Sequence, residues 1–343
     1  MRGWLKPLVL VCAGFLALAV SVPGVLRLSE AVGRHGRTFG ARGDRQSGSV
    51  PATEHLELPR PSPGLDPEWE APLGAPSDIS AASAILVDGN GAVLFARNPT
   101  EPRPPASVTK ILTALVVLER GRQSDTVTVS AGAAKVGGFQ LGLLRGQRAS
   151  LQDLLAAVLI MSANDAAVAA AEHVGGSVGG FAAMMNATAR RIGMTQSRFV
   201  NPHGLHEPDH YTTALDLARL TRVALDHPEF ARLVRSREAT IAIWTSGRRG
   251  FVRQTRVMRN HNRLLGRVEG VDGVKTGYTD AAGRCLVVSA SRGSERMIAV
   301  LLNDPRRWSD ATILLEFGFE AAAARARELP VPGRMPWREA VRG

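Results

Sequence analysis

Strand-like runs stand at both ends of residues 80–325, and helical runs fill the middle. Residues 83–96 hold two β-rich runs around the turn Asp88-Gly89-Asn90-Gly91, which is a strong hairpin signal. Near the other end, residues 284–290 and 297–302 also read as strands. Because such runs bury their apolar faces best in a common sheet, this order predicts an α+β fold. We expect an antiparallel sheet built from both ends of the domain, with a helical cluster on one side.

The middle of the chain has helical periodicity. Residues 108–120 present a broad apolar face that ends at Gly121. The segment Ser150-Leu151-Gln152-Asp153 resembles a capping box at the start of a helix over 151–161. Further helices are expected over 164–173, 178–192, 214–225 and 310–323. Residues 240–244 and 250–259 alternate like strands, and we expect them to join the sheet.

The first 79 residues differ from the rest. Residues 1–26 carry Arg2 and Lys6 before an apolar run, which predicts a signal peptide or an N-terminal membrane anchor. Residues 27–79 are rich in Pro, Gly, Ser and Arg without periodicity, so we expect a disordered linker. Residues 80–325 would form the folded domain. Residues 326–343 form a basic tail whose prolines interrupt any long helix, so any membrane attachment is expected at the N-terminus.

The charge balance indicates either an anionic partner or simply a solvated, arginine-rich surface. The chain has a net charge of +11, and all of it falls after residue 79. A basic domain is attracted to polyanions, but no nucleic-acid motif accompanies the charge. If the charge serves a partner, that partner is expected to be an anionic wall polymer or a membrane surface. Residues 248–267 contain seven arginines and no acidic residue, and they form either a polymer-binding patch or a solvated hairpin.

Lysine is scarce in this chain, which makes its positions informative. It occurs at 6, 110, 135 and 275, within a total of 42 Lys and Arg residues. Arginine cannot accept a proton at neutral pH, whereas a desolvated lysine can. Two of the lysines belong to an ordered set of three short motifs: Ser107-Val108-Thr109-Lys110, Ser162-Ala163-Asn164 and Lys275-Thr276-Gly277.

These motifs fit a serine nucleophile with a lysine base. A serine hydroxyl needs a base within hydrogen-bonding distance, and Lys110 would lie one helical turn from Ser107. Burial would lower the pKa of Lys110 and leave a neutral amine. Ser162 and Asn164 lie between two expected helices, where they could line a cleft or cap a helix. Lys275 would lie on an edge strand.

On that strand, Lys275 and Thr276 could hold a carboxylate, and Gly277 would let a backbone approach closely. Alternatively, the Lys-Thr-Gly motif is an ordinary strand end on the protein surface. Three motifs in this order, however, favour one acyl-transfer site.

Three further segments carry a resemblance to a known family: Asn201-Pro202-His203-Gly204-Leu205, Asn260-His261-Asn262-Arg263-Leu264-Leu265 and residues 270–290. With the three motifs, they resemble the low-molecular-mass penicillin-binding proteins that act as serine D-alanyl-D-alanine carboxypeptidases. The resemblance implies a β-lactamase/transpeptidase-like fold, no cofactor and no metal.

The resemblance also implies a mechanism. Ser107 attacks the bond between two D-alanines of a peptidoglycan stem peptide, with Lys110 as base and Ser162 as proton shuttle. Asn164 would bind the substrate amide, and Lys275 with Thr276 would bind the terminal carboxylate. The N–H groups of Ser107 and Tyr278, beside Gly277, would form an oxyanion hole. β-Lactams would acylate Ser107, and the enzyme would act outside the cytoplasm.

Four alternatives remain open. A D,D-endopeptidase would use the same groups to cleave peptidoglycan crosslinks. A β-lactamase would need a deacylating carboxylate, for which Glu207 is the candidate. A zinc hydrolase could use His203, His206 and His210. A membrane-tethered β-lactam sensor would keep Ser107 and Lys110 without turnover.

Overall fold

The structure is a computed structural model that describes residues 74–328. The predicted signal peptide or anchor over 1–26 lies outside the described residues. Most of the predicted linker and of the basic tail, residues 27–73 and 329–343, also lies outside them. Within 74–328, no helix combines the length and the apolar character that a membrane crossing requires.

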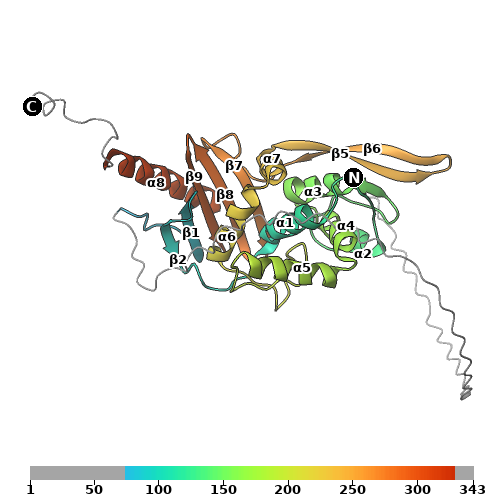
Figure 1. Ribbon diagram of the computed structural model, residues 1–343, viewed down its shortest axis with the longest axis horizontal. Coiled ribbons are helices and arrows are strands. Elements are labelled where there is room, and N and C mark those ends of the chain that lie inside the picture. The colour runs from blue at the N-terminus through green and yellow to red at the C-terminus, as the bar shows by residue number, and fades with distance from the viewer. Residues whose placement is uncertain (1–73, 329–343) are drawn as a thin grey trace, which may run out of the picture. The chain divides into compact units, whose positions relative to one another are not determined.

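A five-stranded antiparallel sheet forms the centre of the fold (Figure 1). Its strand order is β2-β1-β9-β8-β7. The pairing of β1 with β9 places Ser83 opposite Leu302, so the predicted sheet built from both ends of the domain is confirmed. The strands are β1 (Ser83–Asp88), β2 (Val93–Arg97), β7 (Val271–Thr279), β8 (Gly283–Arg292) and β9 (Glu295–Leu302).

Both faces of this sheet are covered. Leu286 and Leu301 belong to a core shared with Leu314 of α8 (Arg307–Glu328). Val287 and Val300 point the other way, into the core that contains the helical cluster. Because a strand covered on both faces gains from apolar residues at every position, β8 and β9 read as nearly continuous apolar runs.

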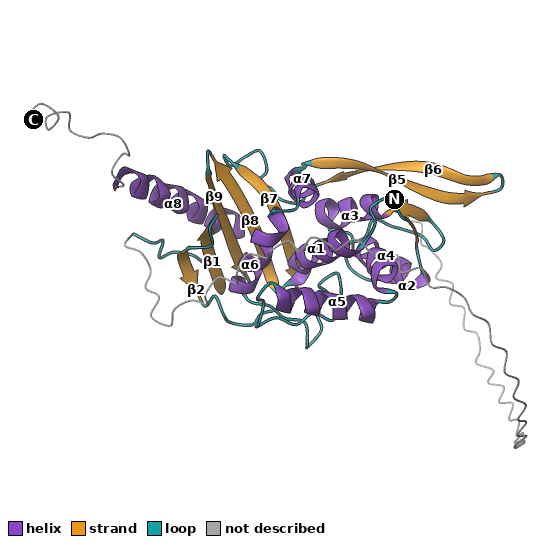
Figure 2. Cartoon of the chain, in the orientation of Figure 1, coloured by secondary structure: helices purple, strands orange, loops and turns teal. Residues whose placement is uncertain are grey.

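The helical cluster packs on the face of the sheet opposite α8 (Figure 2). The expected helices are present, although the segment over 151–161 ends in a π-helical turn at Ala157–Met161. Pro228 does more than end α6, since it opens an additional short helix at a position where proline is favourable. The α-helices are α1 (Lys110–Arg120), α2 (Ala131–Lys135), α3 (Leu151–Ala156), α4 (Asn164–Gly175), α5 (Val178–Arg191), α6 (Ala214–Leu225) and α7 (Pro228–Arg235).

A second sheet of four strands corrects one expectation. The runs near 240 and 250 are strands, β5 (Glu238–Gly247) and β6 (Gly250–Arg259), but they do not join the central sheet. They pair with two short strands, β3 (Thr126–Thr128) and β4 (Arg148–Ser150), in the order β3-β4-β5-β6. Nearly every residue of β6 is exposed, so this strand has no apolar face to bury in the central sheet.

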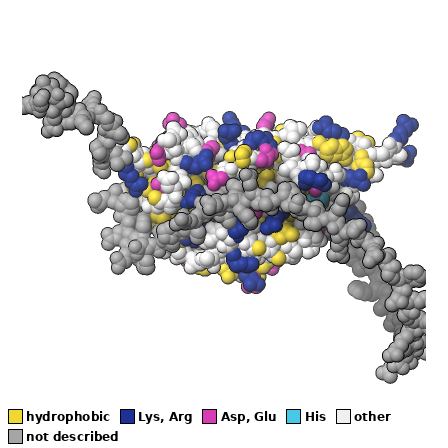
Figure 3. Space-filling view, in the orientation of Figure 1, with side chains coloured by type: hydrophobic (Ala, Val, Ile, Leu, Met, Phe, Trp, Pro, Cys, Tyr) yellow, Lys and Arg dark blue, Asp and Glu magenta, His cyan; other side chains and the backbone are white. Residues whose placement is uncertain are grey.

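The β5–β6 hairpin extends beyond the helical cluster (Figure 1). In Figure 3, blue Lys and Arg side chains stand at the end of the molecule where this hairpin ends. Phe251 and Val257 are exposed on the same strand. The seven arginines of 248–267 are therefore divided between a projecting hairpin and the loop that follows it.

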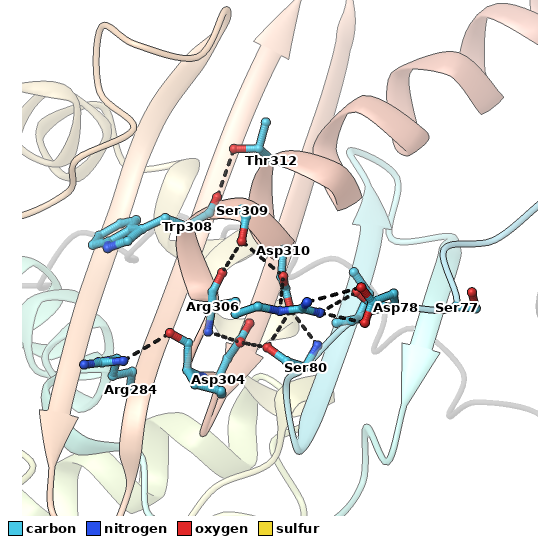
Figure 4. A network of polar contacts seen from close by, with 12 residues as sticks. Ser77, Asp78, Ser80, Arg284, Asp304, Arg306, Trp308, Ser309, Asp310 and Thr312 are labelled. Atoms are coloured by element: carbon cyan, nitrogen blue, oxygen red, sulfur yellow. Dashed lines mark hydrogen bonds and ion pairs between the residues drawn. The ribbon is translucent and has the colours of Figure 1, made fainter.

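A polar network fastens the start of the described chain to the start of α8 (Figure 4). The backbone N–H of Ser80 donates to Asp310, and its hydroxyl contacts both Asp310 and Asp304. Arg306 forms an ion pair with Asp78 at 2.8 Å. This network fixes the first turn of α8, which also supplies side chains to the pocket described next.

Candidate active site

Ser107 lies in a tight 3-10 turn, Ala106–Thr109, that leads directly into α1. Ala106 has a φ of +51°, a conformation that costs a non-glycine residue about 1 kcal/mol or more. A nearby loop of the same polypeptide holds Ala106 in this conformation. A Cβ on Gly204 would stand 1.9 Å from the Ala106 carbonyl oxygen, so the Asn-Pro-His-Gly-Leu loop packs directly against this turn.

Lys110 is fully buried behind the serine. Its Nζ lies 2.9 Å from Ser107 Oγ, 2.7 Å from Asn164 Oδ1 and 2.7 Å from the carbonyl oxygen of His203. Burial, with a smaller contribution from the charge of Lys275, holds the pKa of Lys110 well below its usual value. A neutral amine at this distance can accept the proton of the Ser107 hydroxyl.

Asn164 lies behind the pocket, at the start of α4. Its Oδ1 accepts from Lys110, and its Nδ2 donates to the carbonyl oxygen of Gly137 at 2.8 Å. The side chain is buried, and both of its polar ends contact protein groups. Asn164 thus links the amine of Lys110 to the loop that contains Gly137, and its binding to a substrate amide stays a prediction.

The residue after Asn164 anchors the loop over 136–147. Buried Asp165 accepts hydrogen bonds from the backbone N–H groups of Leu141, Gly142 and Leu143. Its charge also opposes, in part, the lowering of the Lys110 pKa. One carboxylate thus holds the loop that carries Phe139 and acts on the proposed base.

Ser162 follows the π-helical turn and has a left-handed backbone, with φ 66° and ψ 29°. Ser162 is the C-cap residue of this turn. Neither Ser162 nor Asn164 provides the N-cap of α4, because that residue is Ala163 and no side-chain cap bond is present. The π-helical turn ends with the N–H of Ala163 bonded to the carbonyl oxygen of Ala157 at 3.1 Å. This bend directs Ser162 to the wall of the same pocket that contains Ser107.

The third motif lies on β7, an edge strand of the central sheet, as expected. Lys275 is buried, and burial together with the charge of Arg307 lowers its pKa to about 7. A Cβ on Gly277 would stand 3.1 Å from the backbone nitrogen of Ser107, so the strand passes very close to the serine turn. Tyr278 is exposed, and its hydroxyl donates to Asp280 at 2.9 Å.

One pocket of about 630 Å³ brings the exposed members of the three motifs together. We call it the reactive pocket; Ser107, Ser162, Thr276, Gly277 and Tyr278 line it. Lys110, Asn164 and Lys275 lie buried beside it. The other lining residues were not predicted as site residues: Phe139, Asn260, His261, Arg263, Arg307 and Trp308.

The Asn-x-Asn segment accounts for the position of His261 and Arg263 at the reactive pocket. Asn262 Nδ2 donates to the carbonyl oxygen of Gly273 on β7, and Asn260 Nδ2 donates to that of Ser236. These amides hold a short loop against the strand, so His261 and Arg263 reach the reactive pocket. The motif predicted that this segment matters, although it assigned no role to His261, between the asparagines, or to Arg263, which follows them.

Arg307 and Trp308 come from the first turn of α8, which begins three residues before the expected start. The Arg307 Nη1 atom donates to the carbonyl oxygen of Gly277 at 2.7 Å and to that of Cys285 at 3.1 Å. This guanidinium thus lies beside the Lys-Thr-Gly strand. No sequence motif marks it, because its position depends on the polar network of Figure 4.

The histidines of the zinc-hydrolase alternative and the carboxylate of the β-lactamase alternative do not meet at the reactive pocket. Within residues 74–328, no three His, Cys, Asp or Glu side chains form a group that could hold a metal ion. His210 instead contacts Thr109 Oγ1 at 2.8 Å, and His203 Nδ1 accepts from the N–H of Leu205. Glu207, the candidate deacylating carboxylate, is exposed and does not line the reactive pocket.

The fold is that of the DD-transpeptidases and penicillin-binding proteins. A crystal structure of a Streptomyces DD-transpeptidase superposes with a TM-score of 0.67 and 28% identity, covering 71% of this chain and 98% of that one. A Listeria monocytogenes penicillin-binding protein, solved with ampicillin bound, gives a TM-score of 0.61 and 29% identity. That match covers 71% of this chain and 99% of that one.

A family model described as D-alanyl-D-alanine carboxypeptidase matches residues 70–306, and the chain belongs to this family. The curated D-alanyl-D-alanine carboxypeptidase DacF of Bacillus subtilis is 37% identical over 248 residues. That alignment covers 70% of this chain and 62% of DacF. The chain thus spans less than two thirds of the length of this relative.

Proposed function

We propose that this protein removes the terminal D-alanine from peptidoglycan stem pentapeptides through an acyl-enzyme on Ser107. One observation carries the proposal: a buried lysine with a lowered pKa lies 2.9 Å from the serine oxygen. Membership in the D-alanyl-D-alanine carboxypeptidase family supports the same reaction. We propose Ser107, Lys110 and Ser162 as catalytic residues.

In the acylation step, Ser107 Oγ attacks the carbonyl carbon of the penultimate D-alanine, and Lys110 Nζ takes the hydroxyl proton. The backbone N–H groups of Ser107 and Tyr278 would stabilise the oxyanion. Collapse of the tetrahedral intermediate breaks the C–N bond. Ser162 would relay the proton from Lys110 to the leaving nitrogen, so Lys110 becomes neutral again, free D-alanine departs and an ester on Ser107 remains.

In the second step, water attacks the ester and Lys110 again accepts a proton. The ester bond breaks, the serine recovers its proton, and the shortened peptide leaves. The terminal carboxylate of the substrate would bind to Lys275 and Thr276, with Arg307 as an additional partner beside Gly277. A bound carboxylate would stabilise the charged form of Lys275.

β-Lactams are proposed to acylate Ser107 as substrate mimics. The same geometry that presents the serine to a peptide carbonyl would present it to a strained lactam carbonyl. The ampicillin-bound Listeria penicillin-binding protein, which has the same fold, supports this proposal. Without a deacylating carboxylate such as a correctly placed Glu207, the acyl-enzyme is expected to be long-lived.

The proposal places the protein outside the cytoplasm, where peptidoglycan lies. Residues 1–26 would serve as a signal peptide or membrane anchor, residues 27–79 as a linker, residues 80–325 as the enzyme domain, and residues 326–343 as a basic tail. An anionic wall polymer or membrane surface would be attracted by the net charge of +11. Fractionation of cells followed by N-terminal sequencing of the mature protein would test this arrangement.

The reaction is tested by following free D-alanine from a peptide ending in D-Ala-D-Ala. The full-length protein should release it, Ser107→Ala should not, and the control Ser246→Ala, at an exposed position on β5, should match the wild type. Mass spectrometry should detect a penicillin adduct on the same serine. Release of D-alanine by folded Ser107→Ala protein would refute the assignment of the nucleophile.

A further inference from the structure

Strand β6 forms an open edge of the second sheet. It ends the strand order β3-β4-β5-β6, and it supplies no residue to the reactive pocket. Within residues 74–328, the backbone of β6 is hydrogen-bonded to β5 alone. Natural edge strands are usually short, bulged or interrupted by proline, because a long regular edge pairs readily with other chains. β6 has ten residues, no proline and an unbroken register with β5.

The geometry of the hairpin shows which backbone groups of β6 face the open edge. Gly247 and Gly250 close the two-residue turn Arg248-Arg249, and the pair that closes such a turn is hydrogen-bonded. Bonded and non-bonded pairs alternate along an antiparallel ladder, so every second residue of β6 bonds to β5. The remaining residues direct their N–H and C=O groups to the open edge: Phe251, Arg253, Thr255, Val257 and Arg259.

The side chains of β6 give this edge a symmetric pattern. The segment Val252-Arg253-Gln254-Thr255-Arg256-Val257 reads apolar, basic, polar, polar, basic, apolar. All six residues are exposed, and Val252 and Val257 are 56% and 65% exposed. Among the described residues, no carboxylate forms an ion pair with Arg253 or Arg256. The edge therefore offers two uncompensated positive charges between two uncovered apolar side chains.

Two kinds of occupant fit this edge poorly. If two copies of β6 paired antiparallel about the centre of the pattern, Arg253 of one copy would stand opposite Arg256 of the other. Like charges directly opposite each other destabilise a sheet. Insertion into a lipid bilayer would remove water from the unpaired N–H and C=O groups without supplying a partner. A polypeptide strand, in contrast, satisfies these groups and can carry the opposite charge.

We propose that β6 is a docking edge for an extended, acidic segment of a partner protein, which adds antiparallel as a fifth strand of the second sheet. Main-chain hydrogen bonds supply the affinity, and the side chains of alternate residues supply the specificity. The partner segment reads apolar-acidic-x-x-acidic-apolar, with its carboxylates opposite Arg253 and Arg256. This inference does not depend on the reaction proposed for Ser107.

The probe is the blocked peptide acetyl-Thr-Val-Glu-Thr-Thr-Glu-Val-Thr-amide, whose binding to the full-length protein is followed by fluorescence anisotropy. A second peptide has the same sequence with N-methyl groups on its second, fourth and sixth residues. It keeps the charge but loses N–H groups that would face β6.

Two variants and one control are compared with the wild type. R253E/R256E reverses the two charges. Thr255→Pro blocks the edge at a position where proline is tolerated, because the N–H of Thr255 does not bond to β5. The control R325E/R327E reverses two exposed charges on α8. Urea unfolding of each variant establishes that it is folded.

We expect each of the two β6 variants to raise the Kd for the peptide by at least about tenfold, and the control to stay within about twofold of the wild type. The N-methylated peptide should bind at least about tenfold more weakly than the parent peptide. In residue-resolved hydrogen exchange, the parent peptide should slow exchange at the N–H groups of Arg253, Thr255 and Val257. Exchange at Gln254, which bonds to β5, should stay unchanged.

Equal binding of the N-methylated peptide would overturn the inference, because charge alone would then explain the contact. Slow exchange of the Arg253, Thr255 and Val257 amides in the free protein would also overturn it, since a second copy or another segment of the chain would already occupy the edge. Failure of the wild type to bind the peptide would overturn it as well. If R253E/R256E then binds phosphatidylglycerol vesicles more weakly than the wild type does, the surface is a lipid-binding one instead.

Discussion

Replacing Lys275 with methionine should make the protein more stable and less active. Lys275 is buried, and within the described residues its Nζ has one hydrogen-bond acceptor, the Thr276 carbonyl oxygen at 3.2 Å. Its pKa is about 7, compared with an ordinary value of 10.5. At 1.36 kcal/mol for each pH unit, this difference corresponds to about 5 kcal/mol of unfavourable free energy for burying the charged amine.

The sign of the pH dependence follows from proton binding. Between pH 7 and 10.5 the unfolded chain holds the lysine proton and the folded protein does not, so the stability of the wild type rises with pH. Below pH 7 the full penalty applies. Lys275→Met removes this penalty and loses one hydrogen bond worth about 1 kcal/mol, which leaves a gain of about 4 kcal/mol at pH 6. At pH 9.5 the gain should nearly vanish.

Urea denaturation at pH 6 and pH 9.5, monitored by circular dichroism, would measure both effects. Lys135→Met, at an exposed lysine, is the matched control and should change the unfolding free energy by less than about 0.5 kcal/mol at both pH values. Lys275→Met should also lower kcat/KM for the D-Ala-D-Ala peptide about a hundredfold, because the substrate carboxylate loses a charged partner. The reasoning is refuted if the variant is no more stable than the wild type at pH 6, or if its gain is independent of pH.

Three further changes test the site. Lys110→Met should slow penicillin acylation of Ser107 by about 10²–10⁴-fold in stopped-flow measurements, since the serine loses its proton acceptor; a rate within tenfold of the wild type would contradict this. Gly204→Ala should destabilise the protein by at least about 2 kcal/mol in thermal unfolding, because its Cβ would meet the Ala106 carbonyl oxygen at 1.9 Å. Gly146→Ala has a similar positive φ in open space, so an equal effect there would mean that backbone strain alone is responsible. Asp165→Asn should lower the free energy of unfolding by about 1–3 kcal/mol, because the carboxylate accepts hydrogen bonds from three backbone N–H groups of the loop. Loss of its charge should also lower the pKa of Lys110 further. The acid limb of the pH profile of penicillin acylation should then move to lower pH, and a move to higher pH would contradict this account.

The sequence predicted the central sheet well and the second sheet poorly. β1, β8 and β9 are compact apolar runs, and their burial on both faces leaves few other arrangements. In contrast, Arg148 of β4 pairs with Trp244 of β5 across a long stretch of chain, and β4 has only three residues. A strand that short gives no periodic signal. Alternation in β6 therefore indicated a strand without indicating its partner.

The candidate site likewise combines features that are visible in the local sequence with features that depend on distant parts of the chain. The pairing of Ser107 with Lys110 depends on local spacing along one helical segment, which the sequence displays directly. Arg307 reaches the reactive pocket from the opposite end of the domain, through the register of β9 and the first turn of α8. The strained backbone of Ala106 is likewise imposed from outside, by the close approach of Gly204. Such tertiary constraints have no local signature.

The pairing of β1 with β9 also has a consequence for how this protein acquires its structure. Residue 83 finds its partner only at residue 302, so almost the whole domain must be synthesised before the central sheet can close. Contacts of such long range slow folding, because the closure of a large loop precedes the contacts that stabilise it. Until then the β1–β2 hairpin has an open edge, which other chains could pair with. A chain truncated before β9 should therefore collect as aggregate rather than as a smaller folded protein.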